Sequence, residues 1–237
     1  MSGRRVPIGV AGGAVAVLLA ACGGSGTAPT TSRASTTTAP ATSTTMVPTT
    51  TTTTPAAALQ TAVWPTPASA TRYATPVAAA SGFATAYLHM AGPTVGAFRQ
   101  GDSRSGEVPV QPSATGPVTT VLVRQLGSDG TWWVLGAATP RLTLSAPAWN
   151  AVVASPLTVQ GMSMAFEGTV QTQVRADDVA APVGTGFVTG GSTSMGPFRG
   201  SVTFTRPSSA SGAVVLYTTS AEDGSVREVT VVRVRFG

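Results

Sequence analysis

The sequence predicts a mainly β protein in which a small α+β unit precedes a two-sheet β-sandwich, behind a disordered N-terminal linker. Charged residues make up only 10% of the chain, and there are 27 glycines and 18 prolines. After residue 70, many short Val-rich runs are separated by turn residues, and one helical pattern precedes them. Such runs, broken by Gly and Pro, are typical of β-strands. About 170 residues follow the linker, which is enough for one large or two small domains.

Residues 1–21 have the pattern of a bacterial lipoprotein signal peptide. Arg4 and Arg5 give a positive start, and an uncharged apolar run follows that is too short for a membrane-spanning helix. The run ends in Leu19-Ala20-Ala21-Cys22, which resembles the lipobox, where the cysteine is acylated and becomes the mature N-terminus. We therefore expect Cys22, the only cysteine, to carry palmitate-type lipid and to anchor an exported protein to the outer face of the cell membrane. The alternative is an ordinary signal peptide with an incidental cysteine.

Residues 22–70 form the predicted linker. Between residues 23 and 67, Thr, Ala, Pro, Ser and Gly dominate, and Arg33 is the only charged residue. Such a segment cannot bury enough apolar surface to offset the entropy lost on ordering. We interpret it as a tether that lifts the folded part into the cell wall. Ser/Thr-rich tracts with Pro are also typical of O-glycosylated stalks, so glycosylated and bare forms both remain open.

Residues 71–140 form the predicted α+β domain. Thr75 and Pro76 are typical of a helix start, as N-cap and first helical residue, and Gly92-Pro93 ends the helix. We expect His89 to be an exposed residue in its last turn, and the helix to cover one face of an antiparallel sheet. Four strand-like runs follow the helix: Val95–Arg99, Gly106–Gln111, Val118–Leu126 and Thr131–Ala137.

Two features of this domain could bind a ligand. The polar turn between Arg99 and Glu107 contains Asp102 and Arg104. Trp132 and Trp133 project to opposite faces of their strand, because side chains alternate along a strand. One indole should therefore pack under the helix, and the other should meet the second domain, a ligand or solvent.

Residues 141–237 form a predicted immunoglobulin-like domain, because about seven short strands in some 95 residues are typical of that sandwich. The last run alternates, so we expect Val232, Val234 and Phe236 to face the core and Arg233 and Arg235 to face solvent. The expected strands are Leu142–Leu144, Leu157–Gly161, Thr169–Arg175, Gly186–Thr189, Phe198–Thr205, Ala213–Thr219 and Glu228–Phe236.

Particular motifs make the assignment of this domain more specific. Ser155–Gly161 (SPLTVQG) and Phe166–Gly168 (FEG) are followed by the strand and turn elements GFVT, GPFRGSV, SAEDGS and VRVRF. In this order they resemble the immunoglobulin-like domain of bacterial spore germination proteins, over about residues 142–236. The match departs at Trp149-Asn150, where small turn residues are expected. The segment 71–140 resembles one that precedes this domain in actinobacterial lipoproteins.

This resemblance implies an adhesion or assembly module of the cell envelope, with no catalytic residues. The module would bind or scaffold an envelope component through exposed strand edges and the aromatic face near Trp149. The alternative is a glycan- or peptidoglycan-binding module that uses an exposed Trp and the Arg99–Glu107 turn, and an unrecognised hydrolase is a third, weaker hypothesis.

Other functions have little support in the sequence. The 14 basic residues, all arginine, give a formal net charge of +5 but are scattered, so we expect no nucleic-acid binding. Asp177 and Asp178 are adjacent and would point to opposite sides of an extended chain, so they cannot jointly flank a glycosidic bond. Because no zinc-ligand spacing, phosphate loop or EF-hand pattern is present, we expect no metal and no cofactor.

Overall fold

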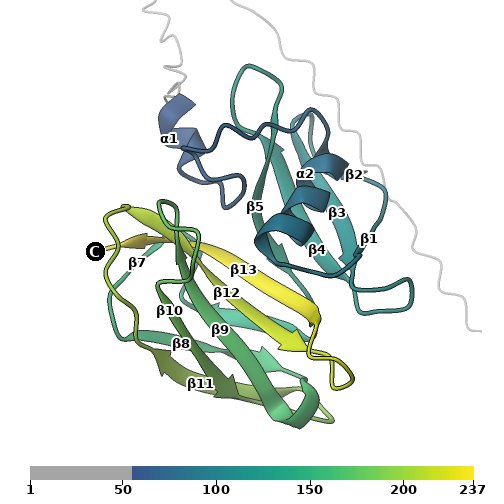
Figure 1. The fold of residues 1–237 in the computed structure, drawn as a ribbon, viewed down its shortest axis with the longest axis vertical. Coiled ribbons are helices and arrows are strands. Elements are labelled where there is room, and N and C mark those ends of the chain that lie inside the picture. Colours follow the sequence, from purple (N-terminus) through teal and green to yellow (C-terminus); the bar gives the residue numbers. More distant parts are fainter. Residues whose placement is uncertain (1–54) are drawn as a thin grey trace, which may run out of the picture. The chain divides into compact units, whose positions relative to one another are not determined.

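The computed structural model describes residues 55–237, which form helices and thirteen strands (Figure 1). The expected signal peptide, Cys22 and the linker up to residue 54 lie outside the described residues. Within residues 55–237, no helix is both long enough and apolar enough to cross a membrane.

Ten of the strands form one sheet, in which eight follow the order β1-β3-β4-β5-β13-β12-β9-β10. At its sides β2 pairs with β3, and β7 pairs in parallel with the end of β13. The strands of this sheet are β1 (Thr94–Val95), β2 (Arg99–Gln100), β3 (Ser105–Gln111), β4 (Thr119–Gln125), β5 (Trp132–Ala138), β7 (Ala151–Val153), β9 (Thr169–Ala176), β10 (Gly184–Thr189), β12 (Ser211–Thr219) and β13 (Val226–Phe236).

A second sheet has three strands in the order β11-β8-β6. These are β6 (Leu142–Ala146), β8 (Leu157–Ser163) and β11 (Gly196–Val202). One core joins this sheet to β9, β12 and β13, and it contains Val159, Val174, Leu216 and Val234. The side chains of these strands alternate between the core and the opposite face, which is the pattern of a β-sandwich. The predicted mainly β, immunoglobulin-like fold is therefore confirmed, and β7 is a strand that the sequence pattern did not show.

One helical segment covers the other face of the ten-stranded sheet. Helix α2 (Pro76–Gly82) begins as predicted, with the Thr75 hydroxyl accepting a hydrogen bond from the Ala78 amide at 3.2 Å. It continues as a π-helical turn, η1 (Phe83–Tyr87). Phe83 and Tyr87 share a second core with residues of β3, β4 and β5 and also of β12 and β13. The helical segment therefore packs against strands from both predicted domains.

The folded region begins earlier than the sequence indicated. Residues 55–70, expected to be linker, include helix α1 (Pro55–Leu59) and the buried residue Val63. The Val63 amide donates to the Val134 carbonyl at 2.8 Å, and the Val134 amide donates to the Trp64 carbonyl at 2.7 Å. The expected linker boundary is corrected, because these apolar residues and their backbone groups bind to the edge of β5.

The two predicted domains also share the ten-stranded sheet. Strand β5 pairs with β13 through Ala137 and Val231, so the sheet continues across the expected boundary at residue 140. At this junction Gly136 lies close to the Val231 backbone, where a side chain would have no room. Beside this junction, residues of β4, β5, β6 and β13 line a cleft that is the candidate site.

Candidate functional site

An apolar cleft lies at the junction between β4–β5 and the sandwich. Its volume is about 380 Å³. None of its lining residues is charged, and their polar side-chain groups are the Thr230 hydroxyl, which donates to the Leu142 carbonyl, and the Trp149 indole N–H. We call it the Trp149 cleft, and its larger side chains are Leu122, Leu135, Leu144, Pro147, Trp149 and Val232.

A β-bulge contributes one wall of the Trp149 cleft. The register between β4 and β5 shifts next to Leu122, so that Leu122 pairs with Gly136, Val123 pairs with Val134, and Leu135 has no direct partner. A bulge bends its strand and re-aims side chains, and bulges are frequent beside binding sites. Leu122 is one of the exposed large apolar residues of the described chain.

Trp149 stands at the rim of the cleft with 54% of its surface exposed. It precedes Asn150, whose φ of 59° is in the left-handed region that Asn tolerates better than most residues. The Asn150 amide donates to the Arg233 carbonyl at 2.7 Å, and Arg235 Nε donates to the Asn150 carbonyl at 3.3 Å. The loop is therefore bound to β13 through both backbone groups of Asn150, and these bonds hold the Trp149 indole at the rim of the cleft.

An edge strand borders the Trp149 cleft. Strand β6, which supplies Leu144, is the last strand of the three-stranded sheet and pairs with β8 on one side. On its other side, the described part of the chain provides the isolated bridge between Thr139 and Leu142 and a hydrogen bond from the Thr230 hydroxyl to the Leu142 carbonyl, and no further strand pairs with it. An edge strand presents backbone N–H and C=O groups that can pair with another polypeptide.

The residues of the predicted polar turn bind one another. Arg99 pairs with Glu107 in the β2–β3 register, and the Asp102 carboxylate accepts a hydrogen bond from the Arg104 amide at 2.7 Å. That hydrogen bond lowers the pKa of Asp102 below its ordinary value. Arg124 lies 3.5 Å from the Asp102 carboxylate, and the Arg104 side chain donates to a carbonyl of the neighbouring hairpin. These contacts hold two hairpins together.

The adjacent tryptophans lie on opposite faces, as predicted. Trp132 is half-buried and packs against the helix-side core, where its ring meets Phe98 edge-on at 5.2 Å. Trp133 is 1% exposed, and the guanidinium of Arg72 lies over its ring at 4.9 Å. The expectation that the second indole would meet the other domain, a ligand or solvent is therefore wrong: a residue of the preceding segment covers it.

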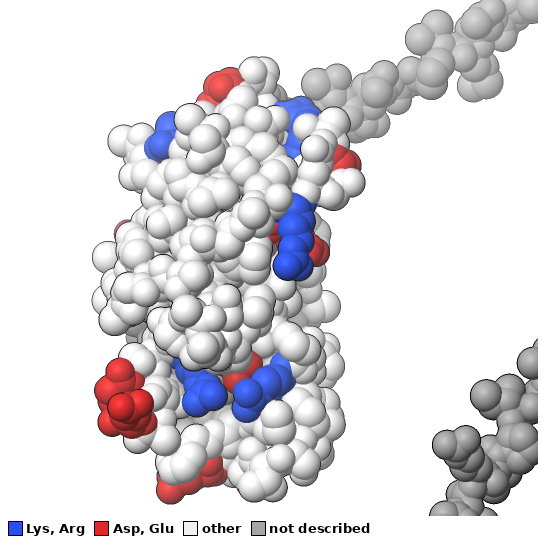
Figure 2. Space-filling model, turned by 90° about the vertical axis from the view of Figure 1, so that its right-hand side faces the viewer, with Lys and Arg blue, Asp and Glu red and all other residues white. Residues whose placement is uncertain are grey.

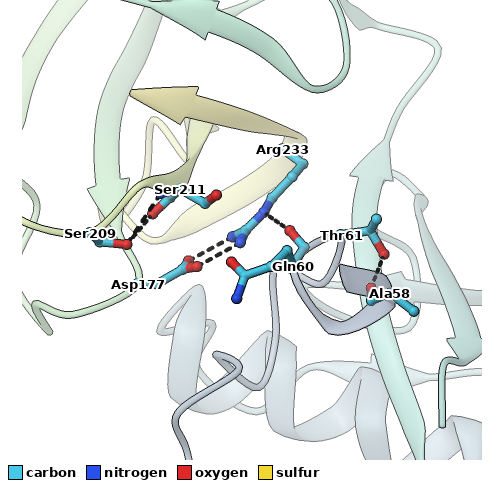
Figure 3. A network of polar contacts seen from close by, with 7 residues as sticks. All are labelled: Ala58, Gln60, Thr61, Asp177, Ser209, Ser211 and Arg233. Atoms are coloured by element: carbon cyan, nitrogen blue, oxygen red, sulfur yellow. Dashed lines mark hydrogen bonds and ion pairs between the residues drawn. The ribbon is translucent and has the colours of Figure 1, made fainter. Parts of the chain in front are cut away.

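Arg233 was expected to face solvent, and this expectation is also wrong. Its side chain is 0% exposed, and it donates two hydrogen bonds to Asp177, at 2.6 and 2.5 Å, and one to the Gln60 carbonyl at 2.8 Å (Figure 3). The outer face of β13 is covered by the segment that was expected to be linker. Asp178 instead accepts from Ser208 and from the Ser209 amide. Both acidic side chains are thus occupied by structural contacts.

Charged groups are sparse over much of the surface. Figure 2 shows one face on which charged side chains form small separate groups, some with blue and red side chains in contact, without a continuous basic stripe. Within residues 55–237, no group of three or more His, Cys, Asp or Glu side chains is arranged to hold a metal ion. The Trp149 cleft combines an uncharged lining with an exposed indole, and we take it as the candidate site.

The comparisons with known proteins agree with this architecture. Residues 142–225 match the family described as the immunoglobulin-like domain of bacterial spore germination, so the predicted resemblance is confirmed for that part of the chain. This match suggests a non-catalytic binding module. Searches of curated proteins and of solved structures found no significant match to the chain.

Proposed function

We propose that the protein is a lipid-anchored, non-catalytic binding module of the cell envelope, and that its Trp149 cleft holds an extended, uncharged segment of a partner protein. One observation carries the proposal: an exposed indole stands at the rim of a charge-free cleft that is bordered by an edge strand. Tryptophan is among the residues that most often dominate the energy of protein interfaces.

The composition of the cleft selects this kind of partner. A sugar ring needs several hydrogen-bonding groups, and the side chains of the cleft offer only the Trp149 indole N–H and the Thr230 hydroxyl, which already donates to the Leu142 carbonyl. A charged segment would lose hydration without gaining an ion pair. An extended apolar segment can bury its side chains against Leu122 and Trp149 while its backbone pairs with β6.

The N-terminal sequence supplies the anchor in this proposal. A diacylated Cys22 would hold the protein at the membrane, because two acyl chains bind a bilayer durably whereas one binds only marginally. The Thr- and Pro-rich residues that follow would act as an extended tether. The cleft would then be presented to envelope components at a distance from the membrane surface.

The glycan-binding alternative has less support in the geometry. Trp133 is covered by Arg72, and the ring of Trp132 packs against Phe98. Asp102 and Arg104 are engaged in holding the hairpins together. A carbohydrate platform would need an open aromatic face beside free polar groups, and these residues do not offer one.

Photo-crosslinking in intact cells tests the proposal. A photoreactive phenylalanine analogue replaces Trp149 in one variant and Phe187 in the control, because Phe187 is 66% exposed on β10, away from the cleft lining. We expect a discrete protein adduct from position 149 that is absent at position 187. Mass spectrometry should locate the crosslink in an uncharged, apolar segment of the partner.

A second variant and a second readout make the result decisive. The same photoreactive residue at Leu122 should give the same adduct, and Trp149→Ala should remove it. Equal adducts at positions 149 and 187, or crosslinks only to glycan or lipid, would refute the assignment of the cleft. Binding of the purified chain to isolated cell walls, measured in parallel, should not depend on Trp149.

A further inference from the structure

A second cavity lies between the end of the helical segment and the outer face of the sandwich. We call it the Arg175 pocket, and its volume is about 160 Å³. Its walls combine polar residues of β9 and β12 with apolar residues of the helix end and β13, among them Leu88, His89, Gln173, Arg175, Tyr217 and Val229. The lining contains no acidic side chain.

Arg175 is a buried cation in this pocket, with 9% of its surface exposed. Its Nε donates to the Gln173 side-chain oxygen at 2.8 Å, its Nη1 donates to the Tyr87 carbonyl, and its guanidinium lies 4.5 Å from the centre of the Tyr87 ring. The side-chain amide of Gln173 in turn donates a hydrogen bond to the Tyr217 hydroxyl at 3.3 Å. Within residues 55–237, Arg175 forms no salt bridge, and its Nη2 takes part in none of these hydrogen bonds.

The surrounding charges leave an excess of positive charge at this face. Arg175 and Arg233 flank Ala213 in one row across β9, β12 and β13. Asp177 is two residues beyond Arg175, but its two carboxylate oxygens are bound by Arg233. Arg233 therefore occupies this carboxylate, and Arg175 has no acidic partner among residues 55–237. A buried charge without a partner is costly, so this arrangement favours the entry of an anion.

His89 also belongs to this pocket. The sequence offered it no partner, but the fold brings it to the wall that contains Arg175 and Tyr217. Its φ of 56° places the backbone in the left-handed region just after the helical segment. His89 and Arg175 are far apart in sequence, and the packing of the helix end on the sandwich brings them to the same pocket.

We propose that the Arg175 pocket binds a small carboxylate with a short aliphatic tail. The carboxylate accepts hydrogen bonds from Arg175 Nη2, and the tail packs against Leu88 and Val229. A carboxylate suits a guanidinium because both groups are planar and their hydrogen bonds are charge-assisted. The volume of the pocket is about that of five water molecules in liquid water. The ligand is therefore limited to a few non-hydrogen atoms.

Methyl NMR of the full-length chain in a non-ionic detergent tests this site, with isobutyrate as the probe. We expect isobutyrate to shift the methyl signals of Leu88, Val215 and Val229 in a saturable manner. The neutral isostere isobutyramide has the same shape but no charge. It should bind at least about tenfold more weakly than isobutyrate, because a hydrogen bond to a charged group is worth about 1.5–3 kcal/mol. This comparison needs no variant, so it does not depend on whether a substitution disturbs folding.

A pair of variants then assigns the binding to Arg175. Arg175→Met should weaken isobutyrate binding to the level of the amide, whereas Arg199→Met, at an exposed arginine of β11, should leave it unchanged. Equal binding of acid and amide would overturn the proposal, since it would show an apolar pocket only. Absence of binding, or equally tight binding of chloride or phosphate, would also overturn it.

Discussion

The buried ion pair between Arg233 and Asp177 gives the sharpest prediction for the fold. Asp177→Asn keeps the shape of the side chain but removes its charge, which leaves the Arg233 guanidinium buried without a counter-ion. Removing one partner of a buried pair costs about 3–5 kcal/mol. The Asp177 side chain retains 14% exposure, so we expect the lower end, about 3 kcal/mol.

The double variant separates the two contributions to this energy. Burial raises the pKa of Asp177, and the hydrogen bonds and charge of Arg233 oppose this shift, so the attraction of the guanidinium offsets much of the penalty of burying the carboxylate. In that case an apolar pair is nearly as stable as the ion pair. Arg233→Met with Asp177→Leu should lose only the hydrogen bond to the Gln60 carbonyl, about 1 kcal/mol.

Thermal unfolding followed by circular dichroism measures both effects. A loss of about 3 kcal/mol corresponds to a drop in Tm of about 6–12 °C for a folded region of this size. Asp178→Asn is the matched control, because this neighbouring side chain is exposed and should change stability by less than about 0.5 kcal/mol. The reasoning would be refuted if Asp177→Asn behaved like this control, or if the double variant were less stable than the single one.

Three other regions of the molecule yield predictions. Burial raises the pKa of Tyr87 from 10.0 to about 12, so the stability it contributes is present below pH 10 and lost as the pH rises towards 12, by roughly 3 kcal/mol. Alkaline unfolding should show this loss in the unmodified chain and in Tyr217→Phe, but not in Tyr87→Phe. Trp133→Ala should destabilise the fold by about 3–5 kcal/mol in urea unfolding, whereas Trp149→Ala should change it by less than about 1 kcal/mol, and equal effects would contradict their difference in burial. Cys22→Ala should abolish incorporation of labelled palmitate and move the protein from the membrane fraction to the soluble fraction, and a protein that is unlabelled and soluble before the substitution would rule out the anchor.

The strands could be read from the sequence because each is specified locally. The run from Thr169 to Arg175 becomes β9, and the run from Gly106 to Gln111 becomes most of β3, since alternating apolar residues and flanking turns define a strand without reference to the rest of the chain. Thr75 and Pro76 define the helix start in the same local way. Alternation also predicted that Val234 would enter the sandwich core.

Burial of the opposite face could not be predicted in that way. Alternation assigns Arg233 to the face away from Val234, and it does lie there, but residues around Gln60 cover that face. A covering segment some 170 residues earlier in the chain leaves no mark on the local pattern of β13. The same limit applies to Trp133, whose cover is Arg72.

Both proposed sites depend on pairings of this long-range kind. The Trp149 cleft exists because β5 joins β13, which places Leu122 and Val232 on one surface, and no turn or spacing specifies that junction. The sequence identified Trp149 because it departs from the expected turn, so it located one rim residue but not the cleft. His89 and Arg175 were individually visible as a helix-end histidine and a strand arginine. Their chemistry follows from the helical segment packing on the outer face of the sandwich, where Arg175 is buried and Arg233 occupies the neighbouring carboxylate.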